Sequence, residues 1–287
     1  MPLVMFSKML QEFSVGEAAE RIKALGFDGV DLTVRPKGHV EPATVGKDLP
    51  AAVAAIHAQG LDVPMASTAI TRATDPHAEA IVEAAARQGI RLLKLGYWNG
   101  PKGKLRESIE QAKQNLDGLE RLAESYKVTF GIHNHSGPGY VNCQPAVVVN
   151  LLHDRDPSRL AAYFDPGHAA VEGGSGGWRQ NLELLGPQIR LVAVKDFGWK
   201  SEPGKVKAVW QAQQVPLCDG LVAWPEVFDA LRQAKFDGPI SLHSEYKGPH
   251  SWRDLTTPEL IEQTAADLAF VKTLLAAPAK SSNSGRS

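Results

Sequence analysis

The stretch SVGEAAERIKALGFDGVDLTV, residues 14–34, contains a helix, a stop signal and a strand in direct succession. Its first part is rich in Ala, Glu and Leu. Ser14 can cap the start of a helix there, and Gly26 can end it. The β-branched run GVDLTV at 29–34 is typical of a strand. A helix joined this closely to a strand is the building unit of α/β folds.

The same rhythm repeats along the whole chain. Short apolar runs predict strands, and helix-forming stretches lie between most of them. The predicted strands are residues 3–9, 29–34, 62–68, 91–98, 128–135, 160–166, 190–197 and 239–246. Strands alternating with helices in this number and over this length predict an α/β fold of the (β/α)8 TIM barrel type.

The main alternative is an open, doubly wound sheet. Such folds carry a G-x-G-x-x-G turn after the first strand, which this chain lacks, and VEGGSGG has no phosphate-loop lysine. No linker or shift in composition marks a second domain. We therefore predict one barrel over residues 1–276 and a flexible polar tail over 277–287. The longest irregular segment is expected at about 200–224, between the last two strands.

Charge and cysteine usage limit the possible partners. The chain has 287 residues, with 31 basic against 32 acidic side chains, so nothing favours nucleic acid or an anionic membrane. Its two cysteines have no C-x-x-C spacing, which argues against a disulfide framework or a thiolate zinc site. No apolar run approaches the ~20 residues of a membrane span. We expect a cytoplasmic protein without nucleic-acid or membrane partners.

The stretch TFGIHNHSGPGY, residues 129–140, ends a predicted strand with two histidines and a Gly-Pro-Gly turn. Barrel strands alternate inward and outward, and chemistry collects at their C-terminal ends. With Ile132 packed outward, His133 and His135 both point inward. The pair is thus placed at the mouth of the barrel.

The same parity places polar groups at the mouth on other strands. Unpaired burial of such groups costs several kcal/mol each, so their convergence indicates a functional site rather than packing. The residues concerned are Arg35, Asp165 with His168 in the following loop, Lys195, His243 and Glu245.

Individual members of this set leave alternatives open. His243 could equally be a satisfied core histidine, and Lys94 an inward ion pair. Asp165 and Glu245 are the strongest candidates. Carboxylates combined with imidazoles are ligands for Mn²⁺, Co²⁺, Zn²⁺ or Fe²⁺. A metal that polarises a carbonyl beside a proton-moving group supports isomerisation, epimerisation or β-elimination.

Five motifs together resemble the xylose isomerase-like TIM barrel superfamily, the sugar phosphate isomerase/epimerase group. The resemblance spans about residues 3–275. The motifs are GFDGVDLTVRPKGHVEP, GIHNHSG, FDPGHAAVEGG, LVAVKDFGW and FDGPISLHSEY.

The resemblance implies one divalent metal ion, held by Glu, Asp, His and Glu from strands five to eight. Asp165 matches the aspartate and Glu245 the final glutamate. His133 stands where the first glutamate is usual, and Ala193 replaces the histidine. The predicted ligand set is therefore His133, Asp165 and Glu245, completed by water and by His135 or His168.

The resemblance also implies roles for other positions. Glu245, His133 and Lys195 are the expected catalytic residues, with Lys195 stabilising an enolate oxygen. The expected substrate-binding residues are Arg35, His39, His135, His168, Asp196 and His243.

These expectations favour a divalent-metal-dependent isomerase or epimerase that acts on a sugar or keto-sugar through an enolate. A lyase of the inosose dehydratase type would use the same enolate, and the loss of a ligand at Ala193 leaves a non-catalytic sugar-binding barrel open. An endonuclease acting at abasic sites is disfavoured by the charge balance. A small carbohydrate is the expected partner, and a homo-oligomer is possible because the group often forms dimers or tetramers.

Overall fold

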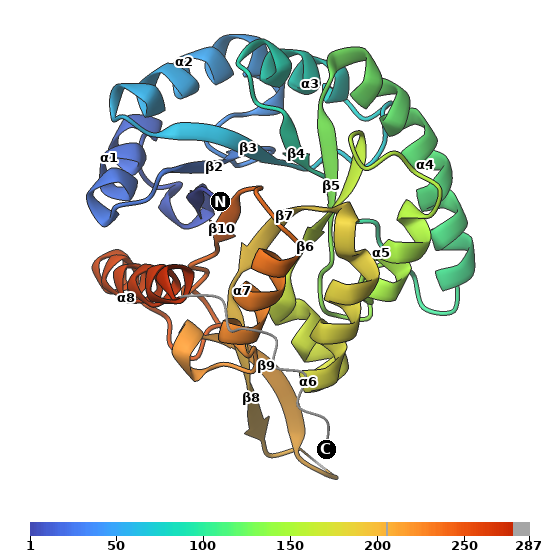
Figure 1. Cartoon of the computed structure of the whole chain (residues 1–287), viewed down its shortest axis with the longest axis vertical. Helices are drawn as coiled ribbons and strands as arrows, with labels where there is room; N and C mark the ends of the chain where they lie inside the picture. The colour runs from blue at the N-terminus through green and yellow to red at the C-terminus, as the bar shows by residue number, and fades with distance from the viewer. Residues whose placement is uncertain (205, 278–287) are drawn as a thin grey trace.

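The computed structural model describes residues 1–204 and 206–277. Eight parallel strands close into a barrel in the order β1, β10, β7, β6, β5, β4, β3, β2 (Figure 1). Their bounds are β1 (Leu3–Phe6), β2 (Gly29–Val34), β3 (Asp62–Thr68), β4 (Leu92–Lys94), β5 (Thr129–His133), β6 (Leu160–Phe164), β7 (Ile189–Val194) and β10 (Ile240–Leu242). The predicted (β/α)8 barrel is confirmed, and each predicted strand contributes one barrel strand.

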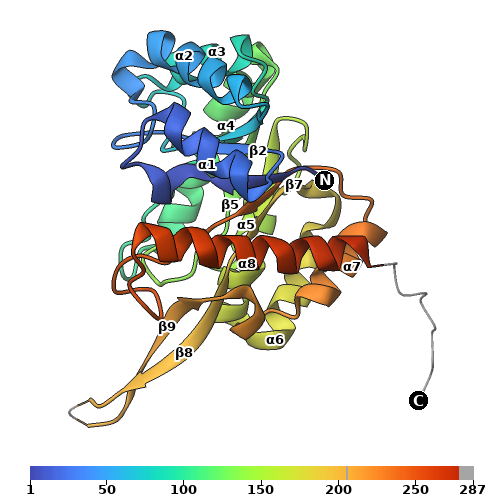
Figure 2. The ribbon, with the colours of Figure 1, turned by 90° about the vertical axis from the view of Figure 1, so that its left-hand side faces the viewer.

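Helices surround the barrel on its outer side (Figures 1 and 2). They are α1 (Val15–Leu25), α2 (Val45–Ala58), α3 (Ala78–Arg87), α4 (Leu105–Tyr126), α5 (Pro145–Leu152), α6 (Pro166–Leu185), α7 (Trp224–Gln233) and α8 (Thr257–Ala276). Short 3₁₀ turns are η1 (Ser7–Leu10), η2 (Pro42–Thr44), η3 (Gly186–Gln188) and η4 (Leu217–Asp219). Within the described residues, no helix has the length and apolar character needed to cross a membrane.

The opening stretch folds as its sequence predicts. Ser14 caps α1 in a capping box with Glu17, so two backbone N–H groups at the helix start find side-chain acceptors. Gly26 ends α1 in the left-handed region, at φ 90°, where a side chain would be strained. The chain then turns directly into β2.

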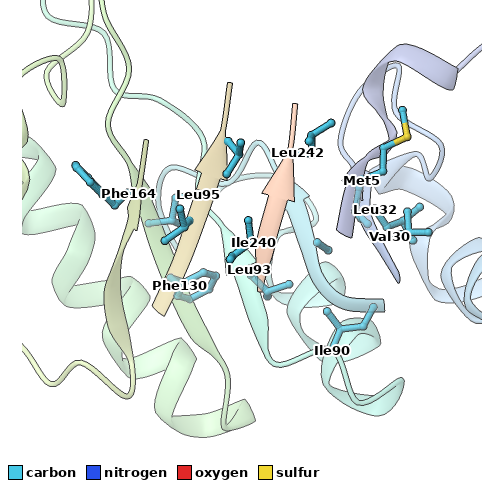
Figure 3. Close-up of a cluster of buried hydrophobic side chains, with 14 of the residues drawn as sticks. Met5, Val30, Leu32, Ile90, Leu93, Leu95, Phe130, Phe164, Ile240 and Leu242 are labelled. Carbon is cyan, nitrogen blue, oxygen red and sulfur yellow. The ribbon is translucent and has the colours of Figure 1, made fainter. Parts of the chain in front are cut away.

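Side chains on the barrel strands alternate between the helix-facing side and the barrel interior. The helix-facing set forms the main hydrophobic core, which includes Ile132, Phe164, Val194 and Leu242. Figure 3 shows Phe164 and Leu242 within this core. The predicted parity of β5, β6, β7 and β10 is confirmed.

A smaller cluster fills the barrel interior. It consists of Val4, Met65, Tyr163, Leu191 and Ala193, all fully buried. The inward positions that follow on these strands are mostly polar, so the polar groups collect toward the C-terminal ends of the strands.

The segment between the last two barrel strands differs from the prediction of an irregular loop. Residues Asp196–Glu202 (β8) and Val209–Val215 (β9) form a two-stranded antiparallel ribbon, which extends away from the barrel (Figures 1 and 2). Most of its side chains are exposed or half-buried. The ribbon is held by backbone pairing rather than burial, so it lacks the hydrophobic pattern that marks a buried strand.

The described residues form one barrel, and the domain bounds 1–276 stay a prediction. The tail predicted over 277–287 lies outside the described residues except for Ala277.

Gly167, in the first turn of α6, packs closely against the backbone at the end of β7. A Cβ atom there would lie 2.3 Å from the carbonyl oxygen of Lys195, which is backbone and cannot rotate away. We expect Gly167→Ala to destabilise the protein by about 1–3 kcal/mol, measured by denaturant unfolding. The control is Gly173→Ala in the same helix, where a Cβ meets nothing within 4 Å. Equal stability of the two variants would contradict this close approach.

Candidate active site at the barrel mouth

Six polar side chains form a continuous chain across the C-terminal end of the barrel. They come from the ends of adjacent strands, in the order in which those strands pair. We call this set the mouth chain. Its members are Tyr97 (after β4), His133 (β5), Asp165 (after β6), Lys195 (after β7), Glu245 (after β10) and Lys8 (after β1).

Each member contacts the next at hydrogen-bond or ion-pair distance. The contacts are Tyr97 Oη to His133 Nδ1 (2.7 Å), His133 Nε2 to Asp165 Oδ2 (3.0 Å), Asp165 Oδ2 to Lys195 Nζ (3.6 Å), Lys195 Nζ to Glu245 Oε2 (3.0 Å) and Glu245 Oε1 to Lys8 Nζ. The side chain of Asp165 is 0% exposed and that of Lys195 4%, so solvent screens the central pair little.

The central ion pairs keep their charges. Burial lowers the pKa of Lys195, but the carboxylates of Glu245 and Asp165 outweigh it and raise this pKa above its ordinary value. Burial likewise disfavours the charged form of Glu245, but Lys195, then His243 and then Lys8 hold its pKa well below the usual range. Burial raises the pKa of Asp165, and the Lys195 ammonium acts against this rise. Lys195 therefore favours the ionised carboxylate on both of its sides.

His133 is a neutral imidazole with both ring nitrogens in use. Burial, followed by the positive charge of Lys195, lowers its pKa well below the ordinary value. Asp165 Oδ2 also takes the Lys195 ammonium, so it acts as an acceptor and His133 Nε2–H donates to it. Nδ1 then accepts from the Tyr97 hydroxyl.

Three further histidines line the mouth chain. His168 Nδ1 forms a hydrogen bond with Ser136 Oγ at 2.8 Å. The ring centres of His135 and His168 are 4.0 Å apart. His243 pairs through Nε2 with the Tyr163 hydroxyl at 2.9 Å. Burial lowers the pKa of His135 and of His243 to about 4.

Two of these histidines have an unused nitrogen. His168 Nε2 and His243 Nδ1 are buried and make no hydrogen bond within the described part of the chain. Each lies 3.8 Å from a mouth-chain carboxylate, Asp165 and Glu245 respectively. An unpaired buried nitrogen costs free energy unless a bound group uses it, so these two positions suit contacts to substrate hydroxyls.

A second charged group lies beside the mouth chain. Asp31 accepts from Ser241 Oγ at 2.8 Å, and burial raises its pKa to about 6. Lys94 lies with its ammonium 3.6 Å from the centre of the Tyr97 ring, and burial followed by Arg35 lowers its pKa to about 7. Lys94 therefore makes a cation–π contact with a mouth-chain residue.

Two residues predicted to bind substrate, His39 and Asp196, make hydrogen bonds within the protein. His39 approaches Ser7 Oγ (3.2 Å) and Thr33 Oγ1 (3.3 Å) through Nδ1, and the Leu10 carbonyl (3.2 Å) through Nε2. Since Ser7 and Leu10 bound η1, His39 holds the turn that carries Lys8.

Asp196 also has a structural position. Its carboxylate accepts from the backbone N–H groups of Phe197, Leu221 and Val222 and from Trp224 Nε1, at 2.7–3.2 Å. These bonds tie the start of β8 to the segment that leads into α7. The substrate contact of Asp196 stays a prediction, and its bonds within the protein position the neighbouring Lys195.

Sequence reasoning missed three participants: Lys8, Tyr97 and Tyr163. Parity applied to the first strand would have found Lys8, since Val4 on that strand faces inward. Tyr163 could have been found in the same way, two residues before Asp165. Tyr97 has no such signal, because the loop after β4 turns it into the mouth.

The predicted metal ligands meet at the mouth, but their arrangement does not fit a divalent ion. Both nitrogens of His133 are engaged by Tyr97 and Asp165, and the Lys195 ammonium lies between the two carboxylates. Ala193 offers no donor. Among residues 1–204 and 206–277, no group of three or more His, Cys, Asp or Glu side chains could hold a metal ion.

The fold and the mouth chain define a (β/α)8 barrel with an ionised site at the C-terminal ends of its strands. The family model for the xylose isomerase-like TIM barrel matches residues 19–274. The chain belongs to this family. A comparison with curated protein sequences finds no match.

Solved structures with the same fold include three of interest. A D-psicose 3-epimerase studied with D-fructose has a TM-score of 0.71 and 16% identity, covering 96% of this chain and 100% of that one. A 3-keto-D-glucoside 4-epimerase from E. coli has a TM-score of 0.69 and 16% identity, covering 95% and 99%. A xylose isomerase-like barrel protein from Mycobacterium smegmatis, in complex with magnesium, has a TM-score of 0.67 and 14% identity, covering 96% and 98%.

The bonding of His133 predicts its tautomer. We expect the proton on Nε2, without titration, between about pH 5 and 8 where an ordinary imidazole changes charge. Two-bond ¹⁵N–¹H correlation spectra of the ring would show this. Tyr97→Phe should shift the Nδ1 resonance because its donor is lost, whereas Tyr140→Phe, on a neighbouring ring, should not. A proton on Nδ1 in the wild type would contradict the assigned bonding.

Proposed function

We propose that this protein is an isomerase or epimerase of a sugar or keto-sugar that works through an enolate-type intermediate. The observation that carries the proposal is the mouth chain, which places Glu245 and His133 on either side of a buried ammonium. The likeness in fold to a D-psicose 3-epimerase and a 3-keto-D-glucoside 4-epimerase supports the substrate class.

The first step removes a proton from the carbon beside the substrate carbonyl. Glu245 takes this proton, and the electron pair of the C–H bond moves into an enolate. The ammonium of Lys195 forms an ion pair with Glu245 and can move to stabilise the negative charge on the enolate oxygen. When the ammonium moves, Glu245 loses the positive charge that lowers its pKa most. Its pKa rises, and the carboxylate becomes a stronger base.

The second step returns a proton to carbon. His133 is separated from Glu245 by two strands, β6 and β7, and carries a proton on Nε2, so it can protonate the opposite side of the enolate. The hydrogen bond from the Tyr97 hydroxyl to Nδ1 stabilises the ring that has given up its Nε2 proton, and Tyr97 keeps its own proton. Exchange with water returns Glu245 and His133 to their starting states, and the product differs from the substrate only in where hydrogen is bonded.

The remaining predicted residues act on substrate hydroxyls in this proposal. His168 and His243 each offer a buried ring nitrogen, while His135 and Arg35 border the same mouth. The single divalent ion expected from the sequence, Mn, Co, Zn or Fe, enters no step, because His133, Asp165 and Glu245 are engaged by other groups of the chain.

Proton exchange provides the test. Incubation with a panel of ketohexoses and 3-keto-sugars in D₂O should give deuterium incorporation and a new isomer by ¹H NMR. Glu245→Gln should lower the rate by about 10²–10⁴-fold because the base is lost. Glu20→Gln on the outer face of α1 is the control and should leave the rate unchanged.

Other products would change the assignment. An absorbing enone in place of an isomer would identify a lyase that uses the same enolate. Sugar binding without exchange on any substrate of the panel would contradict an enzymatic role and favour a sugar-binding barrel.

A further inference from the structure

We propose that the ammonium of Lys195 is the resident cation of this site, and that it takes the place which a divalent metal would otherwise hold between Asp165 and Glu245. The inference deepens the proposed function, since it says what stabilises the enolate. It rests on the position of one side chain, on the ligands still available around it and on the local charge.

The position of the ammonium is that of a bridging cation. Lys195 Nζ lies 3.0 Å from Glu245 Oε2 and 3.6 Å from Asp165 Oδ2. Both carboxylates come from strands that neighbour β7 in the barrel. A buried positive charge between two carboxylates satisfies the electrostatic demand that a metal ion would satisfy.

The ligand atoms of Asp165 and His133 are already used, whereas His168 Nε2 and His243 Nδ1 stay unpaired among the described residues. Asp165 Oδ1 accepts the backbone N–H of His168 at 2.9 Å, while Oδ2 takes His133 and Lys195. His133 has no lone pair left, because Tyr97 bonds its Nδ1. A metal at this point would have to break these bonds and displace the lysine.

The charge of the mouth is balanced without a metal. Among the described residues there, basic side chains are not outnumbered by carboxylates, so a divalent ion would meet repulsion rather than an uncompensated negative charge. The carboxylates are Asp31, Asp165 and Glu245, and the basic residues are Lys8, Arg35, Lys94 and Lys195.

The backbone of Lys195 is held on two sides. Gly167 approaches its carbonyl so closely that no side chain fits between them. On the other side, the Asp196 carboxylate accepts from Leu221 and from the Trp224 indole. The lysine therefore starts from a fixed point, and its ammonium reaches the carboxylates from there.

Binding of Mn²⁺ tests the inference without reference to turnover. Free Mn²⁺ gives an electron paramagnetic resonance signal that is lost on binding. Titration of the wild type should leave this signal undiminished at one equivalent, and prior dialysis against a chelator should change neither the midpoint of thermal unfolding nor the rate of any exchange reaction found above.

Lys195→Met removes the positive charge with little change in side-chain length. The carboxylates of Asp165 and Glu245 should then lack the cation that lies between them. We expect it to bind one Mn²⁺ at least about a hundredfold more tightly than the wild type, because the repelling charge at contact distance is gone. Lys195→Arg, which keeps the charge, should bind none. Lys200→Met on the exposed part of β8 is the matched control and should behave as the wild type.

Two results would overturn the inference. One is stoichiometric Mn²⁺ binding by the wild type that is lost in Asp165→Asn. The other is a folded Lys195→Met protein that binds Mn²⁺ no better than the wild type. If Lys195→Met fails to fold, the titrations of the wild type and of Lys195→Arg decide the question. Failure of the proposed function would appear separately, as absence of exchange, whatever the Mn²⁺ titration shows.

Discussion

The buried ion pairs of Lys195 with Asp165 and Glu245 are the interaction on which the rest of the site depends. Any one of these charges buried alone would cost several kcal/mol, so each requires the others. The barrel makes this possible because β6, β7 and β10 are neighbours and end at the same level. Gly167 and Asp196 then fix the backbone from which the lysine reaches its partners.

This arrangement also suits the proton transfer that we propose for the site. In a water-poor mouth an ammonium acts more strongly on a developing oxyanion than it would in solvent, and it is already in place. The neutral imidazole of His133 and the ionised carboxylate of Glu245 differ in protonation because they differ in partners: Tyr97 and Asp165 for one, two lysines for the other. The two groups are thus kept in different protonation states within one connected network.

Much of the fold and of the site could be predicted from the chain. Strand parity placed His133, Lys195 and Glu245 at one mouth, since side chains alternate strictly along a strand. The ribbon β8–β9 escaped prediction because its strands are not buried. The positions of His39 and Asp196 escaped it too, because a polar side chain near a strand end can face the mouth or serve the backbone beside it.

The amino-acid sequence by itself determined the barrel, the direction in which each strand presents its side chains and the residues that reach the mouth. These follow from local periodicity and from the closure of a parallel sheet. Only the tertiary structure decided which groups touch: that Tyr97 turns back to His133, that Lys8 joins Glu245, and that Lys195 lies between the carboxylates. Such contacts depend on strand order and on side-chain reach across neighbouring strands, which no local pattern encodes.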